Sequence, residues 1–234
     1  MKNYFEKSGI LLTEKQVKLF EMYYNLLIEW NQKINLTSIT EWNEVVKKHF
    51  LDSVIVSKYV SFGSEEKSCI DIGTGAGFPG IPLAILFPKL KITLLDALNK
   101  RIQFLDEVVI KLELKNVNTI HARAEDVARS NLYRDKYDFA VSRAVANIST
   151  LSEYCLPFIK PGGQFISYKS VKVNEELEEY KNAFSKLDCF VQKIETLYLP
   201  GSDIERNFVF ISKEKSTDLM YPRRAGKPSK QPLR

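Results

Sequence analysis

Residues 69–80 read Cys-Ile-Asp-Ile-Gly-Thr-Gly-Ala-Gly-Phe-Pro-Gly, and this stretch decides the fold. An apolar run broken by one acid, Asp71, leads into three glycines at alternate positions, Gly73, Gly75 and Gly77. The pattern predicts a strand that enters a tight loop, because glycine adopts positive φ and lets a ligand approach the backbone. Pro79 and Pro82 then bracket the start of an apolar helix, expected over 81–87. Together these elements predict a nucleotide-binding cradle.

Strands and helices alternate on both sides of this loop. We expect strands over 68–72, 91–96, 117–121, 137–142 and 164–168, with helices over 81–87, 99–112, 124–130, 147–158 and 174–185. Such alternation predicts a mostly parallel sheet. Two further strand-like runs, 191–199 and 206–213, are close enough in sequence to form an antiparallel hairpin at one edge. The expected fold is α/β and Rossmann-like, with seven strands.

The chain divides by pattern into three parts: an N-terminal helical segment (1–62), an α/β domain (63–213) and a basic C-terminal tail (214–234). Thr13 and Gln16 fit a capping box that opens the first helix, and a second helix is expected over 41–58. No run of 18 apolar residues and no signal-peptide core occurs, so we expect a cytoplasmic protein without a membrane span. The sequence does not determine the oligomeric state, and we expect a monomer.

The composition argues against metal and disulfide chemistry. With two histidines and three widely spaced cysteines, Cys69, Cys155 and Cys189, we expect no metal site and three buried thiols. Charge is uneven: residues 221–234 hold five of the 34 basic residues and none of the 29 acids, so the rest of the chain is neutral. Prolines and a glycine in this tail argue against a helix. A flexible basic tail indicates a polyanionic partner, although it is also compatible with a solvated terminus.

Two nucleotides compete for the cradle. Residues 75–80 satisfy G-x-G-x-x-G, which suggests a dinucleotide. The acid-first pattern from Asp71 to Gly77 instead resembles the first motif of Rossmann-like methyltransferases, in which the glycine loop passes under the methionine part of S-adenosylmethionine. On that reading Gly73 and Gly75 line the cofactor. A carboxylate beside the loop would repel a pyrophosphate, which favours the cationic cofactor.

Three later strand ends supply further candidate residues. Asp96 ends the second strand, where an acid accepts hydrogen bonds from ribose hydroxyls, or caps the following helix. Ala124 and Glu125 follow the third strand and could contact adenine, although Glu125 also suits a helix N-terminus. Arg143 follows the fourth strand, where it could meet a cofactor carboxylate, an RNA phosphate or a structural acid.

The loop after the fourth strand lacks two known catalytic devices. Its sequence, Ser142-Arg143-Ala144, is not the Asn/Asp-Pro-Pro-Tyr/Phe motif of exocyclic-amine methyltransferases, and it contains no cysteine nucleophile for carbon methylation. An aromatic ring nitrogen with an exposed lone pair needs no base. The missing groups therefore favour a ring-nitrogen acceptor.

Five motifs in order identify a family resemblance. They are Trp30-Asn31-x-x-x-Asn35-Leu36-Thr37, His49-Phe-Leu-Asp-Ser53, residues 71–80, Ser142-Arg-Ala144 and Tyr221-Pro-Arg-Arg-Ala-Gly-Lys-Pro. The chain resembles the RsmG family over essentially its whole length. The resemblance implies methylation of guanine N7 in 16S ribosomal RNA, within the small subunit or its precursor, with S-adenosylmethionine as cofactor.

The resemblance also implies roles for individual residues. It assigns cofactor contacts to Gly73, Phe78, Ala124, Glu125 and Arg143, while Asp96 follows from general methyltransferase geometry. We expect the tail to bind RNA phosphates, with Lys169 and neighbouring basic residues assisting; the tail residues concerned are Arg223, Arg224, Lys227 and Lys230. No catalytic residue is assigned.

Two questions stay open at this point. A small-molecule methyltransferase and a non-catalytic cofactor-binding assembly factor remain alternative functions. His49, Asp52 and Ser53 share one helix face, which could be part of the RNA or cofactor surface or a hydrogen-bonded seam between the N-terminal helices and the sheet.

Overall fold

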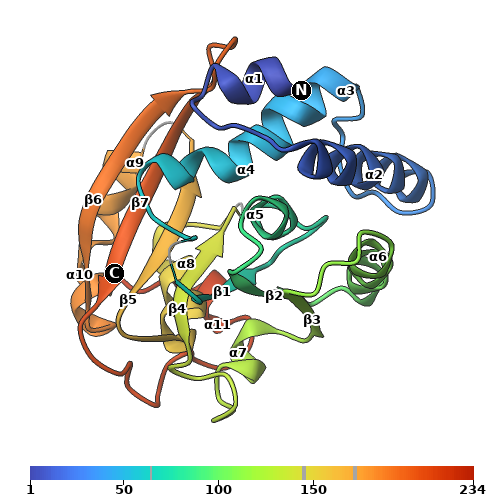
Figure 1. Ribbon diagram of the computed structural model, residues 1–234. Coiled ribbons are helices and arrows are strands. Elements are labelled where there is room, and N and C mark those ends of the chain that lie inside the picture. Colours follow the sequence, from blue (N-terminus) through green and yellow to red (C-terminus); the bar gives the residue numbers. More distant parts are fainter. Residues whose placement is uncertain (64, 144–145, 171–172) are drawn as a thin grey trace.

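A seven-stranded sheet forms the centre of the computed structural model, which describes residues 1–63, 65–143, 146–170 and 173–234 (Figure 1). Its strand order is β3-β2-β1-β4-β5-β7-β6. The first five of these strands run parallel, and β7 is antiparallel to both β5 and β6. The strands are β1 (Ser68–Ile72), β2 (Lys91–Asp96), β3 (Val117–His121), β4 (Tyr137–Ser142), β5 (Ile159–Lys169), β6 (Cys189–Tyr198) and β7 (Glu205–Lys213). The predicted Rossmann-like sheet with its antiparallel edge is confirmed.

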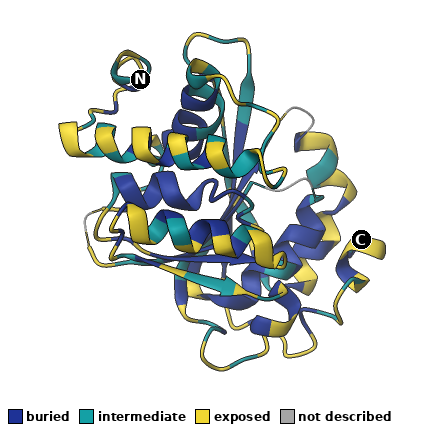
Figure 2. Ribbon diagram, turned by 90° about the vertical axis from the view of Figure 1, so that its right-hand side faces the viewer, coloured by how far each residue is buried: buried dark blue, intermediate teal, exposed yellow. Residues whose placement is uncertain are grey.

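Helices cover both faces of the sheet and bury one hydrophobic cluster on each (Figure 2). One face carries α1 (Lys2–Glu6), α2 (Glu14–Asn31), α3 (Trp42–Val45), η1 (Val46–Leu51), α4 (Asp52–Val54), η2 (Ile55–Lys58), α5 (Gly80–Leu86) and α6 (Asn99–Lys111). The other face carries α7 (Ala124–Val127), α8 (Ile148–Cys155), η3 (Leu156–Phe158), α9 (Val173–Glu179), α10 (Lys181–Lys186) and α11 (Lys227–Lys230). The result is a three-layer α/β arrangement in which the N-terminal helices share the core of α5 and α6.

The N-terminal helices are tied to the sheet layer by polar contacts at their ends. The predicted capping box is present, with Thr13 Oγ1 accepting from Gln16 N and Gln16 Oε1 accepting from Thr13 N. The amide of Gln16 also donates to the carbonyls of Ile85 and Leu86 at the end of α5, both at 3.2 Å. The helix predicted over 41–58 is present as α3, η1, α4 and η2, and its η1 turn is a π-helix, a form that often occurs at functional sites.

An aromatic cluster links these helices to the glycine loop. Phe50 lies 4.9 Å from Phe20, 5.4 Å from Tyr23 and 6.2 Å from Phe78, measured between ring centroids. Phe20, Tyr23 and Phe50 are completely buried, and Phe78 belongs to the loop that follows β1. Because each large ring removes much apolar surface from water, this cluster fixes where the N-terminal helices sit.

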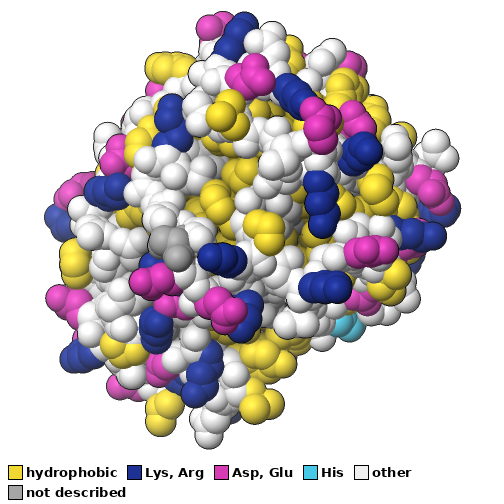
Figure 3. Space-filling model, viewed as in Figure 1, with side chains coloured by type: hydrophobic (Ala, Val, Ile, Leu, Met, Phe, Trp, Pro, Cys, Tyr) yellow, Lys and Arg dark blue, Asp and Glu magenta, His cyan; other side chains and the backbone are white. Residues whose placement is uncertain are grey.

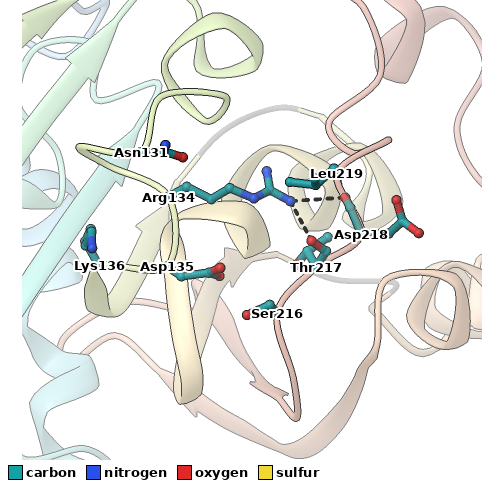
Figure 4. Close-up of a pocket in the computed structure, with 8 residues that line it drawn as sticks. All are labelled: Asn131, Arg134, Asp135, Lys136, Ser216, Thr217, Asp218 and Leu219. Atoms are coloured by element: carbon teal, nitrogen blue, oxygen red, sulfur yellow. Dashed lines mark hydrogen bonds between the residues drawn. The ribbon is translucent and has the colours of Figure 1, made fainter.

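The C-terminal segment is held against the protein, so the prediction of a flexible tail is wrong. Arg134 donates to four carbonyls, including those of Thr217 and Asp218 (Figure 4) and that of Tyr221. Tyr221 and Leu233 are buried. The expectation of no helix is also wrong for α11, because its Pro228 lies in the first turn, where the missing N–H is not needed.

The prediction of three buried thiols is confirmed. All three cysteines are buried and unpaired. Among the described residues, no helix combines the length and apolar character needed to cross a bilayer, and no cluster of His, Cys, Asp and Glu could hold a metal ion. Acidic and basic side chains are interspersed on the face seen in Figure 3.

Replacing Phe50 with alanine should destabilise the protein strongly. The change removes a completely buried ring and leaves a cavity, so the free energy of unfolding should fall by about 3–5 kcal/mol in urea denaturation. The control is Phe190→Ala, because Phe190 is 45% exposed on β6 and should cost less than about 1 kcal/mol. Equal losses for the two variants would contradict the importance of the aromatic cluster.

Candidate functional site

The strand order places a topological switch point, here called the crevice, between β1 and β4. The chain leaves β1 toward α5 on one face of the sheet, and it leaves β4 toward α8 on the other face. In open α/β sheets ligands bind where neighbouring connections diverge in this way, beyond the carboxyl ends of the strands. The glycine loop (residues 73–79) and Arg143 lie on the two sides of this point.

The glycines of the loop serve two different purposes. Gly73 and Gly75 have φ of +70° and +62°, and a Cβ built on either would meet no atom closer than 4.0 Å. A Cβ on Gly77 would instead lie 2.7 Å from Ile81 Cγ1, and one on Gly80 would lie 2.2 Å from Leu94 Cδ2. The first two glycines thus leave open space beside the backbone, as a bound ligand requires, whereas the later two allow close packing.

Hydrogen bonds to residues of β2 and α2 hold the loop in place. The backbone N–H groups of Gly73 and Thr74 donate to the carbonyl of Leu95, at 2.9 and 3.1 Å. Gly75 N donates to Asp96 Oδ2 at 3.0 Å. From the N-terminal helices, the Tyr23 hydroxyl donates to the carbonyl of Ala76. The cradle is therefore preorganised by β2 and α2 together.

Two buried carboxylates lie next to the loop. Asp71 Oδ2 accepts from the Thr74 hydroxyl at 2.7 Å and from Gly80 N at 2.9 Å, and its Oδ1 has no partner among the described residues. Burial raises the pKa of Asp71 to about 7, against the opposing effect of those two hydrogen bonds. Asp96 is also buried; it accepts from Leu98 N at 2.9 Å and pairs with Arg101 at 3.2 Å. Two acidic side chains beside one loop favour binding of a cationic ligand and disfavour binding of a pyrophosphate.

Both carboxylate oxygens of Asp96 have partners within the protein. Its Oδ1 accepts from Leu98 N in the turn before α6, and the N-cap of that helix is Leu98 itself, so the capping role considered from the sequence is not present. Its Oδ2 accepts from Gly75 N, which places the carboxylate at the glycine loop itself. The carboxyl ends of β1 and β2 are thereby joined.

Phe78 connects the cradle to Arg143. The ring of His49 stacks on Phe78 with centroids 4.5 Å apart, and the guanidinium carbon of Arg143 lies 5.0 Å from the same ring. Arg143 also donates to Asp52 Oδ2 at 2.9 Å, and Arg206 donates to Asp52 Oδ1 at 2.7 Å. Arg143 therefore lies at the crevice, and its charge is balanced by a structural acid.

His49, Asp52 and Ser53 form hydrogen bonds between the N-terminal helices and the sheet. His49 Nδ1 lies 3.1 Å from the Lys48 carbonyl and 3.5 Å from Arg143 Nη2, and its Nε2 lies 2.8 Å from the Thr37 hydroxyl. Ser53 Oγ donates to the His49 carbonyl, and the Ser53 carbonyl accepts from Tyr168 on β5. These contacts are the seam considered above as one of two interpretations.

Ala124 and Glu125 lie after β3, at the start of α7, and both are buried. The Glu125 carboxylate has a partner in the C-terminal segment: its Oε1 accepts from Gly226 N at 2.9 Å. Gly226 belongs to the C-terminal segment, 101 residues away in sequence. The structure thus brings two predicted binding regions, the third strand end and the tail, into direct contact.

A depression of about 560 Å³ adjoins Arg143 at the carboxyl ends of β4 and β5. Its described lining contains three basic and three acidic side chains, together with two tyrosines: Arg143, Lys169, Arg206, Asp52, Glu176, Glu179, Tyr168 and Tyr180. Lys169 donates to Glu176 Oε1 and to the Ala146 carbonyl, both at 2.8 Å. A second depression, of about 620 Å³, lies around Arg134 and Thr217 (Figure 4), at the amino ends of the parallel strands and away from the crevice.

The four tail cations predicted to bind RNA have different surroundings. Arg223 forms a bidentate pair with the completely buried carboxylate of Glu153, so its charge is balanced inside the protein. Arg224, Lys227 and Lys230 are exposed, and their side chains have no ion-pair partner among the described residues.

Sequence reasoning missed several residues of this region. Arg206, Glu153 and Tyr168 act through partners at least 70 residues away, and none belongs to a short motif. Arg206 offered one signal, as a cation at the start of a strand that pairs with the carboxyl end of β5.

The fold and the crevice define a class of protein. The chain shares its fold with a SAM-dependent methyltransferase from Aquifex aeolicus, at a TM-score of 0.55 and 19% identity over 72% of this chain and 92% of that one. It likewise resembles TYW2 of M. jannaschii, crystallised in complex with AdoMet, at a TM-score of 0.53 and 20% identity over 69% and 76% of the two chains. The architecture is that of the Rossmann-like methyltransferases.

Comparison of sequences defines a single family within this class. Residues 16–208 match the family model described as rRNA small subunit methyltransferase G. Proteins named ribosomal RNA small subunit methyltransferase G from Lachnoclostridium phytofermentans and Clostridium perfringens are 52% and 48% identical to the chain. The alignments cover 96% and 100% of this chain, and 93% and 98% of those proteins. The chain belongs to this methyltransferase family, which confirms the resemblance found in its motifs.

The state of His49 gives the protein a testable pH dependence. Burial, and then the nearby Arg143 cation, lower the pKa of His49 to about 3, whereas an unfolded histidine titrates near 6.5. The unfolded chain therefore binds the proton first, and stability should fall as the pH drops from about 6.5 to about 3. His49→Phe keeps a ring against Phe78 and removes this term. Between pH about 6.5 and about 3, the free energy of unfolding measured by urea denaturation should fall by roughly a few kcal/mol more for the unaltered protein than for His49→Phe. The same pH dependence in both proteins would contradict this prediction.

Proposed function

We propose that this protein transfers a methyl group from S-adenosylmethionine to N7 of a guanine in 16S ribosomal RNA, in the small subunit or its precursor, in the bacterial cytoplasm. The observation that carries the proposal is the glycine cradle with open space at Gly73 and Gly75, set over two buried acids, in a chain of the rRNA small subunit methyltransferase G family. The organisation into a helical segment (1–62), a methyltransferase domain (63–213) and a basic tail (214–234) is part of the same proposal.

The residues around the crevice fit the cofactor in charge and in shape. Gly73, Gly75 and Phe78 would hold its methionine part, Asp96 its ribose hydroxyls, and Ala124 with Glu125 its adenine. The Oδ1 of Asp71 is buried without a hydrogen-bond partner among the described residues, and the positive charge of the cofactor would compensate this buried carboxylate. Arg143, whose guanidinium lies over the Phe78 ring, would border the cofactor site on the side of β4. When bound, the sulfonium of this cofactor supplies an electrophilic methyl group.

The acceptor side favours a nucleophile that needs no base. Ser142 Oγ donates to the Ile72 carbonyl at 2.9 Å and thus belongs to the sheet, while Cys155 is buried in α8 and burial raises its pKa. Guanine N7 has a lone pair in the ring plane, and the protein's task is to hold it in line with the methyl carbon. The depression lined by Arg143, Lys169 and Arg206 is the proposed place for the target nucleotide, since it adjoins Arg143 at the carboxyl ends of β4 and β5.

The proposed activity is tested by methyl transfer to small ribosomal subunits that lack the modification. Label from tritiated S-adenosylmethionine should appear in 7-methylguanosine after nucleoside analysis. Gly75→Ala should abolish transfer, because its Cβ would occupy the open side of the cradle. Label in another nucleoside would overturn the N7 assignment. Cofactor binding without transfer to any RNA would favour an assembly factor, and methylation of metabolites would favour a small-molecule enzyme.

The structure refines the expected RNA contact of the tail. Because Arg223 is already paired with Glu153, the contact should come from Arg224, Lys227 and Lys230. Replacing these three with alanine should make the plot of log association constant against log salt less steep by about 2 for single-stranded RNA. The matched control replaces three exposed lysines near the amino ends of β2 and β3, Lys89, Lys111 and Lys115, which should leave the slope unchanged. An unchanged slope in the tail variant would exclude these residues as RNA contacts.

A further inference from the structure

The C-terminal segment and the proposed adenine site share one carboxylate. Glu125 is buried, and its Oε1 accepts from the backbone N–H of Gly226. Gly226 has φ of +79°, a conformation that glycine adopts without strain, and it directly precedes α11. The side chain that we assign to the adenine is therefore oriented by a backbone group from the tail.

The position of Gly226 depends on anchors in α8. The buried carboxylate of Glu153 accepts from Arg223 N at 2.7 Å, from Nε at 2.9 Å and from Nη2 at 2.6 Å. Two hydroxyls on the same helix hold the chain beyond Gly226: Thr150 Oγ1 donates to the Pro228 carbonyl at 2.9 Å, and Ser149 Oγ donates to the Leu233 carbonyl at 2.8 Å. Gly226 thus lies between two anchored points.

The Glu125 carboxylate also interacts electrostatically with a side chain of α8. Tyr154, the neighbour of Glu153, has its pKa raised by burial and then by Glu125. A buried acid such as Glu153, removed from water and used only to hold a backbone segment, costs desolvation unless its partner is well placed. Its bidentate pair with Arg223 meets that condition, and it supports a specific geometry at Gly226.

We propose that Glu153 is a positioning residue for cofactor binding: through Arg223 it seats the C-terminal segment, whose Gly226 N–H holds the Glu125 carboxylate in the orientation that receives the adenosine part of S-adenosylmethionine. This inference rests on the proposed binding of that cofactor at Ala124 and Glu125. It gives the tail a role in the cofactor site that is separate from its exposed cations.

The test compares two anchor variants with a matched control. Glu153→Gln and Thr150→Val each loosen the segment at a different point, and both keep side-chain size nearly constant. The control is Asp135→Asn, which disturbs another ion pair with a completely buried member, Lys213, at the amino ends of β4 and β5. Thermal unfolding establishes that each variant is folded before binding is measured.

Dissociation constants for S-adenosylmethionine and for 5′-methylthioadenosine are measured by calorimetry. Both anchor variants should bind both compounds more weakly, by about tenfold for Glu153→Gln, because one hydrogen bond to a charged group is lost. KM for the cofactor should rise while kcat stays near that of the unaltered protein. Asp135→Asn should bind both compounds normally.

The possible failures are distinguishable. Folded anchor variants with unchanged dissociation constants would overturn the positioning role of Glu153 and leave the proposed function standing. A uniform loss in the anchor variants and in Asp135→Asn would show general destabilisation and would also overturn it. If the unaltered protein binds neither compound, the proposed cofactor site itself is wrong.

Discussion

The buried carboxylate of Asp52 joins three parts of the chain that are far apart in sequence. It lies in the N-terminal helices, and it pairs with Arg143 after β4 and with Arg206 at the start of β7. A carboxylate that is only 1% exposed is stable in this state because each of its oxygens faces a guanidinium. The pair with Arg143 also holds that side chain over Phe78, so the position of the glycine loop depends on the same acid.

This arrangement explains why the N-terminal helices belong to the site. Tyr23 binds the loop backbone, His49 stacks on Phe78, and Asp52 holds Arg143. Helices that merely covered one face of the sheet would need only apolar contacts. Here the polar groups of α2, η1 and α4 reach the carboxyl ends of β1 and β4, and the crevice is built from both parts of the protein.

Local sequence patterns predicted most of the fold and some of the candidate site residues. The alternation of apolar runs and helices predicted all seven strands, since period and turn residues are local properties. Gly73 and Asp96 became candidate site residues for the same reason, because a glycine directly after a predicted strand and an acid at the end of one are visible in the sequence. The Glu153–Arg223 pair was not, because it joins residues 70 positions apart, and Arg206 reaches Asp52 across 154. The tail was misjudged because its charges and prolines were counted, while its buried Tyr221 and Leu233 were not.

The aromatic cluster has a spectroscopic consequence. The chain contains two tryptophans, Trp30 and Trp42, and both belong to the N-terminal helices. Trp30 lies 5.8 Å from Phe104, whose ring is 6.4 Å from Tyr23, the residue that donates to the Ala76 carbonyl of the loop. Trp42 lies 6.5 Å from Phe50, whose ring is 6.2 Å from Phe78 in the glycine loop. Both fluorophores therefore sit one or two rings away from the cradle, and a shift of that loop changes their surroundings. Intrinsic emission gives this protein an optical reporter of its cradle without any attached dye.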